Sequence, residues 1–256
     1  MSPAVIVLML TTSLFAGWVD AVVGGGGLIL LPLMMILNPS FTYSQALGVN
    51  KIAAICGTGS SAITMARRVP TARTAFRYAP LAFGGSALGA ILASSVDKDI
   101  MRPIVIVLLV TVGAFVLLRP SFGQVTVRRT VTRGRWVVAL VLITGLGIYD
   151  GAFGPGTGLF LILTITSLLG EDFLNSAAWA KILNTFTNLG ALVIFAINGD
   201  IWWLLGFGLA VTNIVGAQIG ARMVLSKGAG FVRIVLLVVV VLMAGKLALD
   251  QFSVAG

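Results

Sequence analysis

Long apolar segments recur along the 256-residue chain, and polar or glycine-rich stretches separate them. A membrane-spanning helix needs ~20 predominantly apolar residues, and these segments are long enough to provide them. The pattern predicts two groups of segments joined by an arginine-rich cytoplasmic linker at 119–135. The first group comprises a broken segment at 3–37 and helices at 44–66, 78–95 and 100–118. The second group comprises a broken segment at 136–169 and helices at 176–197, 201–221 and 231–249.

Glycines interrupt the first segment of each group. Residues 17–28 read GWVDAVVGGGGL, and residues 147–158 read GIYDGAFGPGTG. Glycine is unfavourable inside a helix because its backbone has the most freedom to lose, so both stretches predict a break. A straight helix over 3–37 would be ~52 Å long, well beyond the ~30 Å hydrocarbon core. Two shorter pieces folded back as a re-entrant hairpin are therefore expected in each group.

The second group repeats the first at a nearly constant offset. Pairs at 130 positions are Asp20 and Asp150, Gly24 and Gly154, and Lys51 and Lys181. Pairs at 131 positions are Gly85 and Gly216, Gly89 and Gly220, and Arg102 and Arg233. Acidic, basic and glycine residues all recur at nearly the same offset, which indicates an internal duplication. We expect one transmembrane domain over 1–256, with one repeat at about 3–118 and the other at about 136–252.

The distribution of charge predicts how the repeats are oriented. The net charge is +9, and twelve of the 17 basic residues fall within 67–77, 119–135 and 222–233. This clustering is typical of cytoplasmic loops under the positive-inside rule, and it argues against a nucleic-acid partner. The four arginines of 67–77 have no basic counterpart at 198–200, and the acidic loop 94–99 corresponds to a basic loop near 222–230. Matching loops are thus expected on opposite sides, which makes the repeats inverted and places both termini outside.

The composition defines the class of protein. With 58% hydrophobic and 10% charged residues, against about 25% charged in soluble domains, the chain is expected to be an all-α, multi-pass integral protein of a prokaryotic-type plasma membrane. The sequence has no histidine and one cysteine, which excludes metal held by histidine or by a thiolate cluster; neither a metal nor a cofactor is expected. No Ser–His or His–Asp constellation points to an enzyme, and no G-x-x-x-x-G-K-[ST] motif points to ATP-driven pumping.

At these residues the sequence resembles the TauE/SafE sulfite exporter family of membrane permeases. The resemblance rests on the two glycine motifs, on Asn50-Lys51 after the first, on AKILNTFTNLG at 180–190 after the second and on GAQIGAR at 216–222, and it covers nearly the whole chain. It implies a permease that moves sulfur-containing anions such as sulfite and sulfonates. The second glycine motif departs from the first, since Pro155 and Thr157 interrupt it.

Two lysines are the leading candidates for substrate binding. Lys51 and Lys181 lie about seven and about five residues inside the predicted helices 44–66 and 176–197. A lysine at the bilayer centre costs roughly 2.5–3.5 kcal/mol on insertion scales, so it usually has a partner or a function. The alternative is snorkelling, in which the long side chain reaches the interface. Recurrence at one offset favours substrate binding.

The glycine breaks and neighbouring polar residues complete the predicted site. A half-helix that begins at a break presents free N–H groups, which suit an anion. Asp20 and Asp150 could pair with the lysines, cap the second half-helix or carry a proton, and the first two roles are favoured. The asparagines could line a cavity or hydrogen-bond neighbouring helices. The remaining substrate-binding candidates are Gly25, Gly26, Gly27, Asn50, Gly156, Thr157, Asn184 and Asn188.

These observations favour a secondary transporter of small, sulfur-containing anions that works by alternating access of two inverted halves. Its partners would be the small anion and the lipid bilayer, with protons as a candidate coupling ion. The alternative is a passive anion channel of the same fold. A membrane scaffold would have no need of paired intramembrane lysines.

Overall fold

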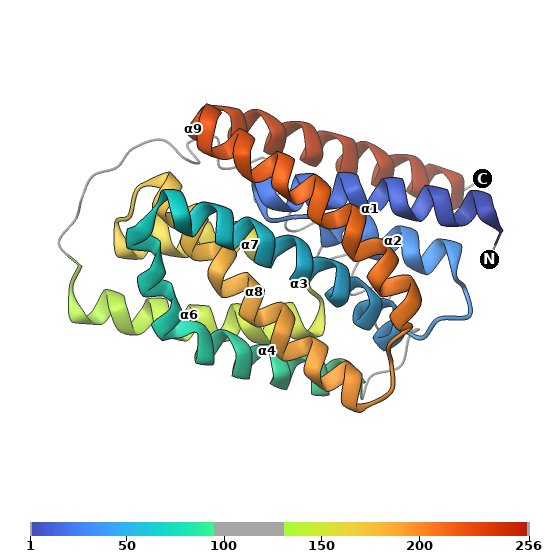
Figure 1. Cartoon of the computed structure of the whole chain (residues 1–256), viewed down its shortest axis with the longest axis horizontal. Coiled ribbons are helices and arrows are strands. Elements are labelled where there is room, and N and C mark those ends of the chain that lie inside the picture. The colour runs from blue at the N-terminus through green and yellow to red at the C-terminus, as the bar shows by residue number, and fades with distance from the viewer. Residues whose placement is uncertain (1, 95–130, 255–256) are drawn as a thin grey trace.

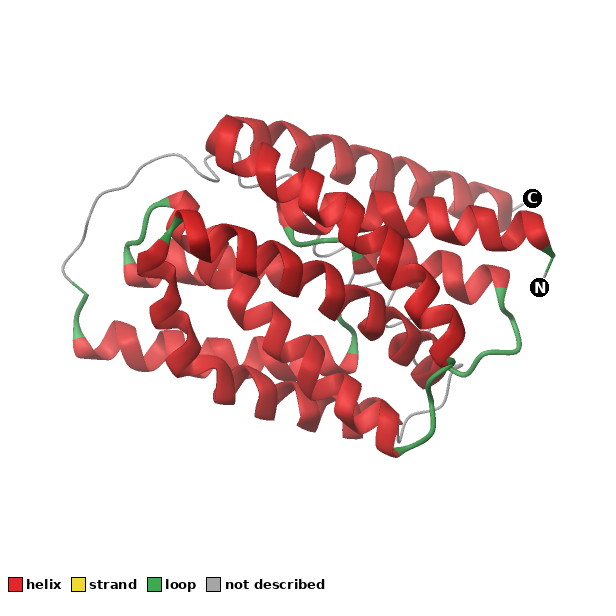
Figure 2. Ribbon diagram, in the orientation of Figure 1, coloured by secondary structure: helices red, strands yellow, loops and turns green. Residues whose placement is uncertain are grey.

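The computed structural model describes residues 2–94 and 131–254, which are almost entirely helical and contain no strand (Figures 1 and 2). The expected helix at 100–118, the turn at 97–99 and most of the linker at 119–135 lie outside the described residues. An all-helical membrane fold is therefore confirmed for the part of the chain that the structure describes. The inversion of the two repeats across a membrane stays a prediction.

The helices follow one another in two series. The first series is α1 (Pro3–Val23), α2 (Gly27–Leu37), α3 (Tyr43–Arg68), the 3-10 helix η1 (Pro70–Tyr78) and α4 (Ala79–Ser94). The second series is α6 (Arg133–Ala152), α7 (Thr157–Thr164), the π-helix η2 (Ile165–Leu169), α8 (Phe173–Ile197) and α9 (Trp203–Val254). α9 consists of two helices joined at a kink, where Gly228 has φ 68° and ψ −162°.

The two series share the period of 130 residues. α6, α7 and α8 begin 130 positions after α1, α2 and α3, respectively. Side chains cap several of these starts: Ser2 and Thr132 accept hydrogen bonds from the N–H groups of Val5 and Arg135, and Thr42 forms a capping box with Gln45. Such caps satisfy N–H groups that the first helical turn leaves free.

Four of the described helices are long and apolar enough to cross a membrane: α1, α6, α8 and the part of α9 over Trp203–Val232. The 11-residue α2 and the segment Thr157–Leu169 are shorter apolar helices. Each broken segment therefore consists of two shorter helices, as expected from its glycines. The first limb of each has 21 or 20 residues and is long enough to cross a membrane by itself, so the re-entrant course of the hairpin stays a prediction. Figure 1 shows α2 returning beside α1 to the end of the molecule at which α1 begins.

The two series interlock. α1 packs against α9 and α6 packs against α4, so the first limb of each broken segment contacts a helix of the other series. α3 and α8 contact each other, α3 also packs against α9, and α8 also packs against α4. Small residues allow the close approaches: a Cβ on Gly85 would lie 2.5 Å from the carbonyl oxygen of Thr144 in α6, and a Cβ on Gly220 would lie 2.7 Å from that of Trp18 in α1. Small residues at a four-residue spacing have the same function in other membrane bundles.

Three expected loops are partly helical. Arg133 and Arg135 belong to α6 and not to the linker, because Thr132 caps a helix that begins at Arg133. Most of 67–77 is also helical: Arg67 and Arg68 end α3, and η1 begins at Pro70, directly after its N-capping residue Val69. Residues 222–227 continue α9 up to the kink at Gly228, since one glycine in a left-handed conformation suffices to turn the chain.

Candidate functional site

The two glycine breaks cross in direct contact. Gly24 ends α1 with φ 80°, and its N–H donates to the carbonyl oxygen of Asp20 at 2.7 Å. A Cβ on Gly24 would lie 2.5 Å from the carbonyl carbon of Gly158, a separation that no side chain tolerates. A Cβ on Gly27 would lie 3.6 Å from Cα of Pro155. The breaks of the two series therefore meet, and the starts of α2 and α7 lie at their crossing.

Lys51 is enclosed in a buried polar cluster. Its Nζ donates to Asp150 Oδ2 at 2.6 Å and to Asn188 Oδ1 at 3.1 Å. Asn188 in turn donates through Nδ2 to Thr58 Oγ1 at 3.4 Å. The side chains of Lys51 and Asp150 are 1% and 2% exposed. This cluster is sealed from solvent.

Lys181 forms the corresponding cluster with Asp20. Lys181 Nζ lies 3.0 Å from Asp20 Oδ2 and also donates to the main-chain oxygen of Asp20. The second carboxylate oxygen, Oδ1, accepts the N–H of Gly26 at 3.4 Å. Asp20 thus pairs with the lysine and also holds the N–H of the residue that precedes α2. Its side chain is 16% exposed, whereas that of Lys181 is 1% exposed.

Both ion pairs join one series to the other. Each lysine lies on the long helix that follows its own break, α3 or α8, and binds the aspartate that precedes the break of the other series. Of the roles considered for the aspartates, the structure displays pairing for both, and Asp20 also accepts the N–H of Gly26, the residue before α2, without capping the helix itself. Snorkelling of the lysines does not occur, because protein encloses both ammonium groups. A buried pair that loses one partner leaves an uncompensated charge, which typically costs about 3–5 kcal/mol.

The other predicted residues contribute in different ways. Asn50 is 5% exposed, and its Nδ2 lies 3.8 Å from where a Cβ on Gly27 would be, beside the crossing. Asn184, at 4% exposure, accepts a hydrogen bond from Thr187 Oγ1 at 3.1 Å, and no hydrogen bond joins it to either lysine. Thr157 donates to the carbonyl oxygen of Gly154 at 3.0 Å, so its hydroxyl stabilises the second break from within.

The glycine candidates lie at the starts of the two short helices. Gly26 and Gly156 are the N-capping residues of α2 and α7, and neither helix has a side-chain cap. Gly25 is buried beside Leu28, and Gly156 has φ 82°. The N–H groups of Leu28 and Ile29 in the first turn of α2 donate to the carbonyl oxygens of Gly25 and Gly26. The starts of α2 and α7 nevertheless direct the positive ends of their helix dipoles at the crossing, where they favour negative charge.

Sequence reasoning missed three polar residues of this region. Thr58 supports Asn188, and its position 130 residues before Asn188 is a signal that the period could have revealed. Tyr149 donates its hydroxyl to the carbonyl oxygen of Pro155 at 2.7 Å, and Tyr43 donates to that of Ala152 at 3.1 Å. Both tyrosines bind carbonyl oxygens that α6 and its break leave free. The hydrogen bond of Tyr43 joins residues 109 positions apart, so it has no local sequence signature.

Comparison with known proteins identifies relatives over nearly the whole chain. The model of the family "Sulfite exporter TauE/SafE" matches residues 9–247. The "Probable membrane transporter protein ORF9" of Sinorhizobium sp is 34% identical over 243 residues, covering 94% of this chain and 92% of its own. The "Probable membrane transporter protein YfcA" of Escherichia coli strain K12 is 33% identical over 253 residues, covering 98% and 92%. A "Probable membrane transporter protein" of Haemophilus influenzae is 33% identical over 237 residues, covering 92% and 91%. No solved structure matches the chain.

Proposed function

Since the chain belongs to the sulfite exporter TauE/SafE family of membrane transporters, we propose that it is a secondary transporter that carries small sulfur-containing anions, such as sulfite or an organosulfonate, by alternating access. It is an integral membrane protein and not an enzyme. The named relatives are bacterial, which supports a prokaryotic plasma membrane as its location. The proposed cargo binds where the two glycine breaks cross.

The carboxylate of Asp20 carries this proposal. One of its oxygens lies 3.0 Å from the ammonium group of Lys181, and the other accepts the N–H of Gly26 at the start of α2. A buried lysine and a helix N-terminus are the two donors that a small oxyanion requires. Asp20 therefore occupies the place that the sulfur-bound oxygens of a sulfite or sulfonate group would take. The cargo would replace the carboxylate and bind the same donors.

The charge of the two clusters suggests how protons could be coupled to this exchange. Two lysines and two aspartates pair to zero net charge, so an anion gains no net attraction while both carboxylates are ionised. A proton taken up by Asp20 would release Lys181 and the Gly26 N–H and leave one positive charge for the anion. The accessible side chain of Asp20, 16% exposed against 2% for Asp150, makes it the proposed proton acceptor.

Alternating access fits the interlocked packing. Each lysine is sealed, so the cargo reaches Lys181 only after the helices around the crossing separate. Because each ion pair joins the two series, breaking one pair loosens the contact between a long helix and the opposite break. The proposed inverted repeats would open this contact on one side of the membrane at a time.

Uptake by purified protein in liposomes tests the proposal. Sulfite, small sulfonates, sulfate and simple carboxylates are compared with and without a proton gradient. Lys181→Gln should weaken binding of the transported anion by about 1.5–3 kcal/mol, the usual value of a charge-assisted hydrogen bond. Lys227→Gln, which removes an equal charge from a side chain that lies over the ring of Phe231, should leave affinity unchanged.

Two outcomes would reject this function. A flux that does not saturate as the anion concentration rises, and that follows the anion gradient alone, would identify a passive anion channel. If Lys181→Gln and Lys51→Gln both bind and transport as the parent does, the lysines do not contact the cargo. Asp20→Asn separates the proton step from binding. This variant should still exchange the anion on one side of the liposome membrane for the same anion on the other, but a proton gradient should no longer accelerate its transport.

A further inference from the structure

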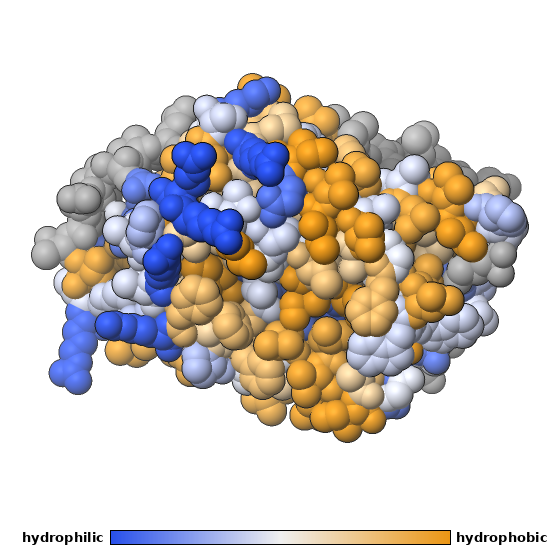
Figure 3. Space-filling view, viewed as in Figure 1, coloured by the Kyte–Doolittle hydropathy of each residue, from blue (hydrophilic) through white to orange (hydrophobic). Residues whose placement is uncertain are grey.

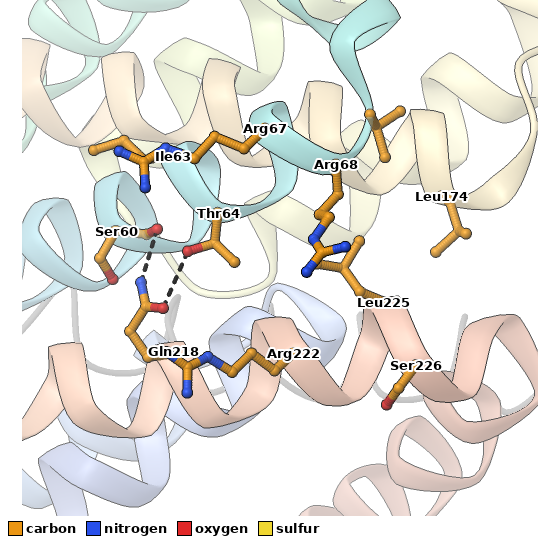
Figure 4. Close-up of a pocket in the computed structure, with 11 residues that line it drawn as sticks. Ser60, Ile63, Thr64, Arg67, Arg68, Leu174, Gln218, Arg222, Leu225 and Ser226 are labelled. Carbon is orange, nitrogen blue, oxygen red and sulfur yellow. Dashed lines mark hydrogen bonds between the residues drawn. The ribbon is translucent and has the colours of Figure 1, made fainter.

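A large pocket lies away from the ion-paired crossing, between the last turns of α3 and the part of α9 before its kink (Figure 4). Its volume is about 860 Å³, and neither Lys51 nor Lys181 lines it. Small-molecule pockets typically measure ~300–1,000 Å³, so this one has room for an anion with a substantial organic body. A sulfite-sized ion would leave most of it empty.

Three arginines give the pocket a strong positive charge. Arg67 and Arg68 come from the end of α3, and Arg222 comes from α9. Within the described ranges, no acidic side chain lies within ion-pair distance of these arginines, since the only two salt bridges there are those of the buried lysines. Figure 4 shows Arg68 reaching into the space between the two helices. Guanidinium groups bind phosphate oxygens in a bidentate manner, and no carboxylate of the described residues competes for these three.

The floor of the pocket is polar and held in place. Thr64 donates through Oγ1 to Gln218 Oε1 at 3.0 Å, and Gln218 Nε2 donates to the carbonyl oxygen of Ser60 at 2.9 Å (Figure 4). These bonds tie α3 to α9 beneath the arginines. Apolar side chains form the rest of the wall, among them Ile63, which is 57% exposed, and Leu225. The pocket thus combines a cationic rim with an apolar side.

An exposed apolar stripe on α9 leads directly to this pocket. Its members are spaced by three or four residues, so they share one helical face. They are Leu204, Phe207, Val211, Val215 and Ile219, exposed by 90%, 55%, 64%, 47% and 48%. Arg222 and Ser226, which line the pocket, continue the same face. Figure 3 shows a hydrophilic patch at one end of this side of the molecule and a mainly hydrophobic surface beside it.

We propose that this pocket binds the phosphate headgroup of an anionic phospholipid of the cytoplasmic leaflet, while an acyl chain lies along the α9 stripe. The stripe extends over ~22 Å of helix, which exceeds the ~15 Å depth of one leaflet's hydrocarbon. Basic pockets between transmembrane helices are suited to anionic headgroups, and the apolar stripe has no function for a free ion. The lipid would bridge α3 and α9 on the surface of the bundle. This inference is independent of which anion is transported.

Native mass spectrometry of the purified full-length protein tests the inference, with phosphatidylglycerol and phosphatidylcholine as probes. Removing all three charges, by Arg67→Gln, Arg68→Gln and Arg222→Gln together, should weaken phosphatidylglycerol binding about a hundredfold and leave phosphatidylcholine unaffected, given a contribution of about fivefold for each arginine. The matched control removes three arginines from the chain outside the pocket, Arg77, Arg133 and Arg135, and should change the affinity by less than about threefold. Single Arg→Gln variants supply the same comparison if the triple variant does not fold.

Two further arms distinguish a lipid from a free anion. Val215→Ser with Ile219→Ser should weaken phosphatidylglycerol but not glycerol phosphate, because only the lipid has an acyl chain on the stripe. Inorganic phosphate or sulfite at millimolar concentration should not displace the lipid. Equal affinities in the pocket and control triple variants, or displacement by a soluble anion, would overturn the assignment.

Discussion

At the scale of single residues, the two ion pairs are alike in position and unlike in environment. Lys51 and Asp150 are almost completely buried, with Asn188 as an additional partner. Asp20 retains 16% exposure and divides its carboxylate between Lys181 and a backbone N–H. The first pair therefore has the character of a structural link, and the second has the accessibility that exchange with an anion requires.

Loss of Lys51 is expected to reduce stability more than loss of Lys181. Lys51→Gln leaves the carboxylate of Asp150 buried without a countercharge, which should cost about 3–5 kcal/mol of unfolding free energy. Adding Asp150→Asn removes that charge, so the double variant should recover most of the loss. Thermal unfolding in detergent measures both, with Lys181→Gln as the comparison. A double variant less stable than Lys51→Gln would contradict this explanation.

Lys181→Arg is expected to restore only part of the anion affinity that Lys181→Gln loses. The side chain is 1% exposed, so the larger planar guanidinium must displace its neighbours, and overpacking costs about 1–3 kcal/mol. Affinity for the transported anion is measured against the parent, with Lys227→Arg as the control. If Lys181→Arg bound the anion as tightly as the parent, the site would require a positive charge at this position but not the shape of the ammonium group.

At the scale of helices, sequence predicted most elements within a few residues. The period of 130 correctly matched α1, α2 and α3 with α6, α7 and α8, because duplicated helices keep their capping positions. It did not predict the π-helix at Ile165–Leu169, which no local sequence pattern marks. It also predicted a loop near 222–230 where the chain turns at Gly228 alone, because one glycine in a left-handed conformation is sufficient. The pairing of Lys51 with Asp150 and of Lys181 with Asp20 was one of several alternatives. Only the crossing of the breaks in space selects it.

The crossing of the breaks should be intolerant of a single methyl group. Gly24→Ala combines a left-handed backbone, with φ 80°, and a contact of 2.5 Å with Gly158, and the penalties of about 1–2 and 1–3 kcal/mol should add. Gly145→Ala on α6 is the control, because nothing lies within 4 Å of its Cβ, and it should be neutral or stabilising by up to about 1 kcal/mol. Thermal unfolding of the two variants compares them. Equal stability would mean that the breaks do not touch.

At the scale of the whole molecule, the two series are interdependent. The first limb of each broken segment packs on a helix of the other series, and both buried ion pairs also join the two. Basic side chains from distant parts of the chain, Arg67, Arg68 and Arg222, meet in one pocket. Under the positive-inside rule this end of the molecule is expected to face the cytoplasm. The opposite end then contains the start of α1 and the turn between α2 and α3, as Figure 1 shows.

The last prediction concerns this orientation, which decides whether the repeats are inverted. In a Cys56→Ser background, single cysteines replace Ser2, Ser40, Thr74 or Ser226. If α1 and α2 form a re-entrant hairpin, Ser2 before α1 and Ser40 after α2 lie on one side, although α1 alone is long enough to cross. An impermeant thiol reagent added to intact cells should label positions 2 and 40, and it should reach positions 74 and 226 only after permeabilisation. Labelling of positions 2 and 40 from opposite sides would show that α1 crosses without return. The halves would then contain an even number of crossings each, and the inverted arrangement on which alternating access depends would be lost.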